Sequence, residues 1–124
     1  MKKFKTFMEQ KTRSASNIKP EITYVYFTYK KGPLMMDKIS KFVKDSFIET
    51  ENGVSKTVYE YSMDSFDANN MSGKWEIESR WNHTTYNRNF DTEKQFEDFK
   101  KKLIKKGKDV TKDFKWKRLK NTLH

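Results

Sequence analysis

Residues 21–30, EITYVYFTYK, constrain the fold more than any other stretch of this chain. Every residue from Ile22 to Tyr29 is β-branched or aromatic, and this composition favours a β-strand. Neither face of such a strand carries a charge along this run, so we expect it in the interior of a sheet, covered on at least one face. Any fold proposed for this chain must therefore contain a sheet.

The periodicity that follows predicts a helix. Gly32 would end the strand, and Pro33 suits the first position of a helix. Apolar residues then recur at helical spacing, namely Met35, Ile39, Phe42, Val43 and Phe47. Asn52-Gly53 predicts a tight turn after this helix.

Two alternating segments and a second helix follow. Residues 54–63 and 74–81 alternate in the manner of half-buried strands, and we interpret the polar residues 64–73 between them as a loop. Asp91 or Thr92 can cap a helix, and Thr92 with Gln95 fits a capping box. Gly107 would end that helix.

This order of elements predicts an α+β fold. It corresponds to a two-layer sandwich of the ferredoxin-like βαββαβ type, with an antiparallel sheet and two helices on one face. An antiparallel meander with both helices packed on one side is the alternative. We expect residues 20–107 to form the body, 1–19 a basic mobile arm, and 108–124 a basic segment that is an edge strand or a short helix.

Positive charge is concentrated at the two ends. Residues 100–120 contain eleven Lys/Arg and two Asp, a net charge of +9, in a chain whose total is +10. Residues 1–19 carry +5 and residues 20–99 carry −4. The lysines of 100–106 complement the dipole of the predicted helix, whereas those of 108–120 have no such local reason.

Catalytic and metal-binding patterns are sparse. The chain has no cysteine and two histidines, which excludes disulfides and cysteine zinc sites. His83 and Tyr86 could serve a phosphodiester-cutting site, but such sites generally use paired histidines for the metal. We expect a protein that is not an enzyme and has no metal or cofactor; a metal-dependent nuclease is the alternative. No apolar run suits a signal peptide or a membrane helix, so we expect a cytoplasmic protein without membrane contact.

Aromatic and basic residues together favour nucleic-acid binding. Tyr24 and Tyr26 could stack on bases from an open sheet face, as the aromatic residues of an RRM do, although its RNP1 pattern is not matched. Basic residues would hold phosphates. The candidates, with one aromatic residue among them, are Lys105, Lys106, Lys108, Lys112, Lys115, Trp116, Lys117, Arg118, Lys120, Arg80 and Arg88.

A protein partner is the alternative to nucleic acid. A small inhibitor or adaptor of the phage or mobile-element type could bind a host protein or ribonucleoprotein, such as a nucleic-acid-handling defence enzyme. Its +9 segment would cover an acidic surface, or its acidic body would occupy a site that normally holds nucleic acid. The sequence leaves open the choice between DNA and RNA, between single and double strands, and the oligomeric state.

Overall fold

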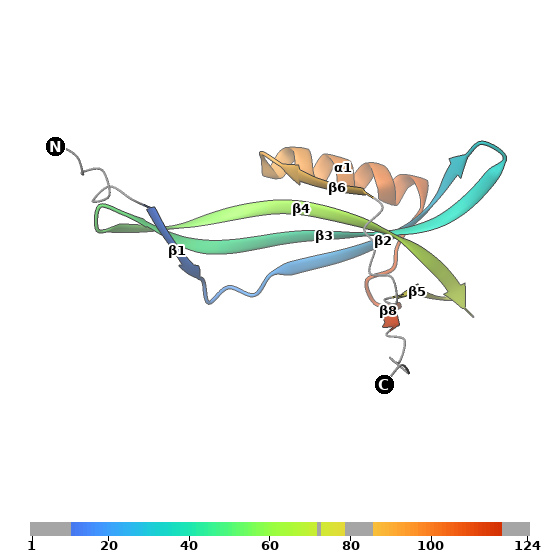
Figure 1. The fold of residues 1–124 in the computed structure, drawn as a ribbon, viewed down its shortest axis with the longest axis horizontal. Coiled ribbons are helices and arrows are strands. Elements are labelled where there is room, and N and C mark those ends of the chain that lie inside the picture. Colours follow the sequence, from blue (N-terminus) through green and yellow to red (C-terminus); the bar gives the residue numbers. More distant parts are fainter. Residues whose placement is uncertain (1–10, 72, 79–85, 118–124) are drawn as a thin grey trace, which may run out of the picture.

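A computed structural model describes residues 11–71, 73–78 and 86–117 of the chain (Figure 1). It contains one helix and a set of strands in those ranges. The elements are β1 (Lys11–Ala15), β2 (Glu21–Lys31), β3 (Leu34–Glu51), β4 (Val54–Met71), β5 (Lys74–Glu78), β6 (Tyr86–Phe90), α1 (Glu93–Lys106), β7 (Lys108–Asp109) and β8 (Phe114–Lys117).

The strands form one sheet with the order β7-β2-β3-β4-β5-β8, to which β1 adds by pairing with β3 and β6 by pairing with β4. All pairs are antiparallel except β5 with β8, which is parallel. The long β3–β4 ribbon extends well beyond α1 on the side of β1 (Figure 1). The prediction of a two-layer α+β sandwich with two helices is therefore wrong: the described residues form a mostly β fold with one helix.

The first predicted helix is strand β3. Its apolar residues lie at helical spacing because the strand buries residues on both faces of the sheet: Phe42 packs toward α1, and Ile39 packs on the opposite side. A strand covered on both faces loses the simple alternation that identifies a half-buried one. Gly32, with φ of +61°, and Pro33 form a two-residue hairpin turn between β2 and β3, so Pro33 does not begin a helix.

The predicted loop at 64–73 is also wrong, because β4 continues to Met71. Residues up to Asp67 pair with β3, and those from Ala68 pair with β5. The stretch is polar, which favours a loop, but its backbone pairs with β3 and then with β5 and so forms a strand. Within it, Ser65 and Phe66 are buried, on opposite faces of the sheet.

Other local predictions are confirmed. Strand β2 covers the predicted 21–30 segment. Asn52 and Gly53 both have positive φ, 54° and 80°, as a type I′ hairpin turn requires. Thr92 caps α1 by accepting a hydrogen bond from the backbone N–H of Gln95, and Gly107 stands at its C-cap.

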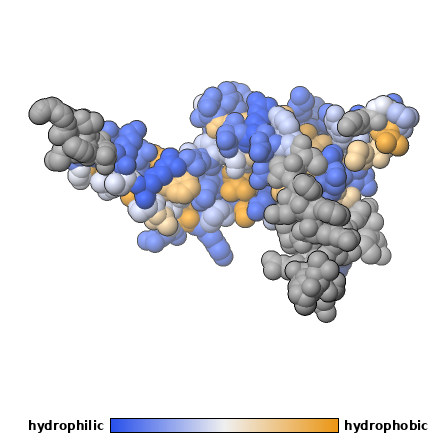
Figure 2. Space-filling view, in the orientation of Figure 1, coloured by the Kyte–Doolittle hydropathy of each residue, from blue (hydrophilic) through white to orange (hydrophobic). Residues whose placement is uncertain are grey.

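The sheet has a hydrophobic core on each face. The first lies under α1 and contains Val25, Phe42, Met63, Phe90, Phe96 and Leu103. The second lies on the opposite face, the side of β5 and β8 in Figure 1, and contains Ile39, Phe66, Trp75 and Val110. The outer side of α1 is hydrophilic (Figure 2). Both faces of the sheet centre are thus occupied by the protein itself.

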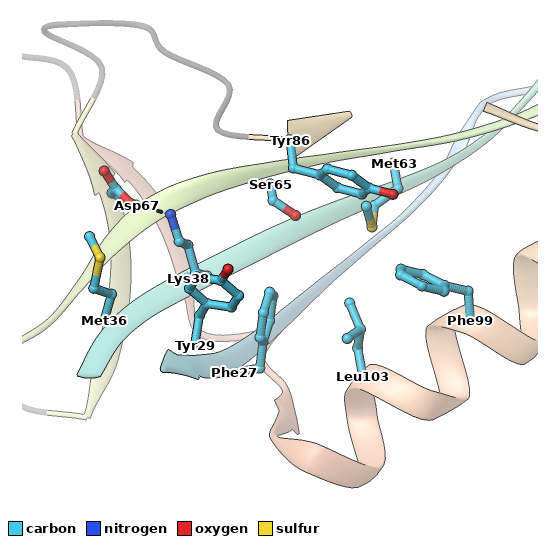
Figure 3. A pocket seen from close by; sticks show the side chains of 10 residues that line it. All are labelled: Phe27, Tyr29, Met36, Lys38, Met63, Ser65, Asp67, Tyr86, Phe99 and Leu103. Atoms are coloured by element: carbon cyan, nitrogen blue, oxygen red, sulfur yellow. Dashed lines mark hydrogen bonds and ion pairs between the residues drawn. The ribbon is translucent and has the colours of Figure 1, made fainter. Parts of the chain in front are cut away.

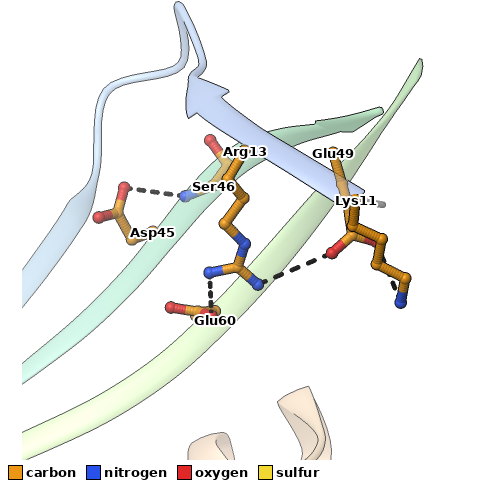
Figure 4. Close-up of polar contacts among 6 residues, drawn as sticks. All are labelled: Lys11, Arg13, Asp45, Ser46, Glu49 and Glu60. Carbon is orange, nitrogen blue, oxygen red and sulfur yellow. Dashed lines mark hydrogen bonds and ion pairs between the residues drawn. The ribbon is translucent and has the colours of Figure 1, made fainter. Parts of the chain in front are cut away.

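Strand β1 lies within the segment predicted to be a mobile arm, and residues 1–10 are outside the described residues. It pairs with β3 from Lys11 to Ala15. The Arg13 guanidinium donates to Glu60 at 2.6 Å and lies 4.0 Å from Glu49 (Figure 4). Arg13 therefore ties β1 to both strands of the β3–β4 ribbon.

Candidate functional site

The C-terminal strap, which we define as residues 107–117, carries the chain around the edge of the sheet. After α1, Lys108 and Asp109 pair with Tyr26 and Val25 at the edge of β2. Val110 then enters the second core, and its N–H donates to the carbonyl of Tyr24 at 2.8 Å. The strap thus leads from the face covered by α1 to the opposite face, where β8 pairs with β5.

The acidic residues of α1 are all in ion pairs. Glu93 accepts from Lys44 at 3.0 Å, Asp98 pairs with Lys94 at 2.9 Å, and Glu97 pairs with Lys100 at 3.3 Å. Hydrogen bonding to Glu93 raises the pKa of Lys44, and hydrogen bonding to Asp98 raises the pKa of Lys94. The negative charge of the helix is therefore compensated within the protein.

Seven lysines beyond these pairs form what we call the basic surface. All seven are exposed, and none makes an ion pair with a carboxylate of the described residues. They are Lys101, Lys102, Lys105 and Lys106 of α1, and Lys108, Lys112 and Lys115 of the strap. The series follows the chain from the second half of α1 around the edge of β2.

Five of the predicted site residues belong to this basic surface: Lys105, Lys106, Lys108, Lys112 and Lys115. Trp116 and Lys117 lie in β8, but their side chains are outside what the structure describes. Arg80, Arg118 and Lys120 lie outside the described residues, as does His83.

Tyr24 and Tyr26 do not form an open platform. The ring of Tyr24 stacks on Phe114, and Tyr26 packs at a tilt against Trp75, with centroids 5.1 Å apart. The Tyr26 hydroxyl donates to Asp37 at 2.9 Å. Burial raises the pKa of both phenols, and the hydrogen bond to Asp37 raises the pKa of Tyr26 further. Both rings pack against the second core.

Arg88, the remaining predicted residue, lies close to the basic surface. It projects from β6, and its guanidinium carbon stands 5.0 Å from the ring centre of Phe99 on α1. The ammonium of Lys102 lies 6.0 Å from the same ring. The structure therefore brings two cations from distant parts of the chain to one aromatic ring of the helix.

That ring also lines a groove between α1 and the sheet (Figure 3). The groove has a volume of about 620 Å³. Phe27 and Tyr29 of β2, Tyr86 of β6, and Phe99 and Leu103 of α1 supply apolar surface. Lys38 and Asp67 also line the groove and form an ion pair of 2.6 Å.

Sequence reasoning missed most of the groove because two of its elements were misassigned. Lys38 lies in the stretch that was predicted to be a helix, and Asp67 in the stretch that was predicted to be a loop. With β3 and β4 as long paired strands, Lys38 and Asp67 become direct cross-strand neighbours. An opposite-charge pair placed in register across a hairpin was the signal that could have found them.

The described residues contain no group of three or more His, Asp or Glu side chains that could hold a metal ion. Within the same ranges, no helix has the length and apolar character needed to cross a membrane. Comparison with known proteins found no family model, no curated protein and no solved structure that matches this chain.

Proposed function

We propose that this protein binds nucleic acid, without catalysing a reaction, through the basic surface of α1 and the strap. The observation that carries the proposal is the contrast along one helix. Its acids are paired with lysines, while Lys101, Lys102, Lys105 and Lys106 have no described carboxylate partner.

Clustered lysines repel each other, because like charges one helical turn apart are destabilising. A polyanion would relieve this repulsion and release the counterions that surround its own phosphates. Contacts of this kind give affinity and orientation, with little sequence information. The proposal therefore predicts binding that depends steeply on salt.

The test is fluorescence anisotropy with labelled single-stranded RNA, single-stranded DNA and duplex DNA across a salt series. A variant with Lys101, Lys105, Lys112 and Lys115 changed to Ser removes four charges from the basic surface. For duplex DNA its salt slope should be flatter by up to about 3.6, at about 0.9 per phosphate contact. Affinity at physiological salt should fall on all three ligands.

A matched control removes the same charge elsewhere. Lys19, Lys30, Lys56 and Lys74 are exposed and lie outside the basic surface, so changing all four to Ser should affect binding much less. Equal losses in the two variants would mean that net charge alone attracts the ligand, and would contradict the proposed surface.

A second candidate function is that of an inhibitor or adaptor that binds a protein. The hairpin between β2 and β3 favours it, since Leu34 and Met35 at its tip are each 62% exposed. Exposed apolar side chains at a hairpin tip offer surface that a protein partner could cover. A partner that stays bound after nuclease treatment and in about 0.5 M salt, where most phosphate binding is lost, would support this function over the first.

A further inference from the structure

We infer that the groove between α1 and the sheet holds one unpaired nucleobase, so that the protein prefers single strands to duplexes. This inference rests on the proposed function, because it assigns a place to one base of the nucleic acid that the basic surface would bind. It stands on three features of the groove.

The first feature is a set of flat apolar walls. Phe27 and Tyr29 come from β2, Tyr86 from β6 and Phe99 from α1 (Figure 3). Tyr86 is 51% exposed, so part of its ring is open to a ligand. A volume of about 620 Å³ lies within the usual range of small-molecule sites. Planar aromatic ligands suit such walls, because every base has a π-face that can stack on them.

The second feature is the electrical neutrality of the polar groups in the groove. Lys38 is 11% exposed at its side chain and is paired with Asp67 at 2.6 Å. The ammonium can donate further hydrogen bonds and the carboxylate can accept them. A neutral base edge, which carries both donors and acceptors, matches this pair. A carboxylate or phosphate in the groove could pair only with the Lys38 ammonium and would lie beside the negative charge of Asp67, which is 2.6 Å from that ammonium.

The third feature is the cations at the rim. Arg88 and Lys102 both lie against the ring of Phe99, at 5.0 and 6.0 Å, and neither pairs with a carboxylate among the described residues. Because Phe99 lines the groove, phosphates next to an inserted base would come close to these two cations. Lys102 also belongs to the basic surface, so a strand following that surface would pass the groove.

An aromatic groove lined by a neutral ion pair, with cations at its rim, therefore matches the parts of a nucleotide. A base can enter only when it is not paired, and extracting it from a duplex requires unstacking energy. This is the reason for the expected preference for single strands.

The first experiment compares Tyr86→Ala with the parent protein in anisotropy titrations on single-stranded and duplex oligonucleotides. Loss of one stacking contact should weaken single-strand binding by about 5-fold to 150-fold and change duplex binding less than about 2-fold. Tyr86→Phe should retain single-strand binding. Tyr59→Ala is the matched control, since Tyr59 is 45% exposed and does not line the groove. Equal effects of Tyr86→Ala on both ligands, or none on either, would overturn the inference.

The second experiment separates failure of the groove from failure of the basic surface. Met36 and Met63 line the groove, whereas Met35 lies 62% exposed at the hairpin tip. With ¹³C-methyl-labelled methionine, adenosine monophosphate at millimolar concentration should shift the NMR signals of Met36 and Met63 but not that of Met35.

If no oligonucleotide binds but these signals shift, the proposed function fails while the groove keeps its nucleotide ligand. If oligonucleotides bind but the signals of Met36 and Met63 stay in place, the inference fails and the proposed function stands. A shift caused by N-acetyltryptophanamide but not by the nucleotide would overturn the inference and assign the groove to a partner protein's aromatic side chain.

Discussion

The rings of Tyr24 and Phe114 stack almost in parallel, with centroids 3.8 Å apart and planes 10° from each other. Tyr24 belongs to β2, and Phe114 begins β8 near the far end of the chain. Together with the hydrogen bond from Val110 to the Tyr24 carbonyl, this stack fixes the strap on the sheet. The positions of Lys112 and Lys115 in the basic surface depend on it.

Replacing Phe114 by Ala should therefore loosen the strap. We expect the free energy of unfolding to fall by about 2 kcal/mol, because the variant loses one partly buried ring and its aromatic contact. Relative to the parent protein, amide hydrogen exchange in residues 108–115 should accelerate more than exchange in α1. Urea unfolding and exchange measurements test this, and an unchanged stability with slow exchange in the strap would contradict the stacking.

Gly107 is required by close approach between α1 and β2. A β-carbon added at residue 107 would collide with the carbonyl oxygen of Tyr26 and would lie 2.9 Å from the Cα of Phe27. Both are backbone atoms, which cannot move without disturbing the sheet. Gly107→Ala should cost about 3 kcal/mol, the upper end of the usual range for overpacking.

Gly53→Ala is the comparison for that variant. Gly53 has φ of +80° but open space around it, so Ala there should cost only the backbone strain of about 1–2 kcal/mol. Thermal and urea unfolding of the two variants should rank them in this order. A smaller loss for Gly107→Ala than for Gly53→Ala would argue against the close approach.

Local signals in the sequence were enough for the elements that have a distinctive end or composition. The run from Ile22 to Tyr29 predicts β2, the Asn52-Gly53 pair predicts a tight turn, and the Thr92 cap with Gly107 delimits α1. Each depends on backbone conformations or propensities that a few neighbouring residues determine.

The identity of β3 depended on partners far away in the chain. Ile39 and Phe42 are spaced as in a helix, and only the presence of one core on each face of the sheet makes them strand residues. Nothing near them in the sequence shows that Phe96 will cover one face and Val110 the other. The groove was not predicted for the same reason, because Lys38 and Asp67 become neighbours only when β3 and β4 pair.

The same two-sided covering explains why Tyr24 and Tyr26 were predicted to be open for base stacking. That the two tyrosines share one face follows from strand alternation. The residues that cover this face are Phe114 of β8 and Trp75 of β5, and both follow the β3–β4 ribbon in the sequence. The positive charge of residues 100–120, in contrast, can be read directly from the sequence, since it needs no distant partner to be recognised. Lys101 and Lys102 were nevertheless attributed to the helix dipole and were not among the predicted site residues.

Alkaline pH should destabilise the protein through its partly buried tyrosines. Burial raises the pKa of Tyr24, Tyr26 and Tyr61 above the ordinary value of 10.0. Above pH 10 the unfolded chain releases these protons before the folded protein does, so the free energy of unfolding falls as pH rises. Below about pH 9 the phenols are essentially protonated in both states and contribute no pH dependence.

Tyr26→Phe provides the control, because it removes one of the three groups along with its hydrogen bond to Asp37. At pH 8 we expect this variant to be less stable than the parent by about 1 kcal/mol. Urea unfolding at pH 8, 9.5 and 11 should show the difference shrinking as pH rises. A difference that is constant or grows would contradict the raised pKa of Tyr26.

Arg13 should hold β1 in place while contributing little to global stability. Its ion pairs with Glu60 and Glu49 are partly exposed, and its guanidinium carbon stands 4.9 Å from the ring centre of Phe47. Exposed pairs of this kind contribute about 0–1 kcal/mol, so Arg13→Ala should lower the free energy of unfolding by less than about 1 kcal/mol. Amide exchange within 11–15 should nevertheless accelerate, because β1 pairs only with β3 among the described strands. Lys11→Ala is the control, because Lys11 makes only a 4.0 Å contact to Glu49, whereas Arg13 also makes a 2.6 Å contact to Glu60. Lys11→Ala should change this exchange less. Equal effects of the two variants would show that Arg13 has no special role in docking β1.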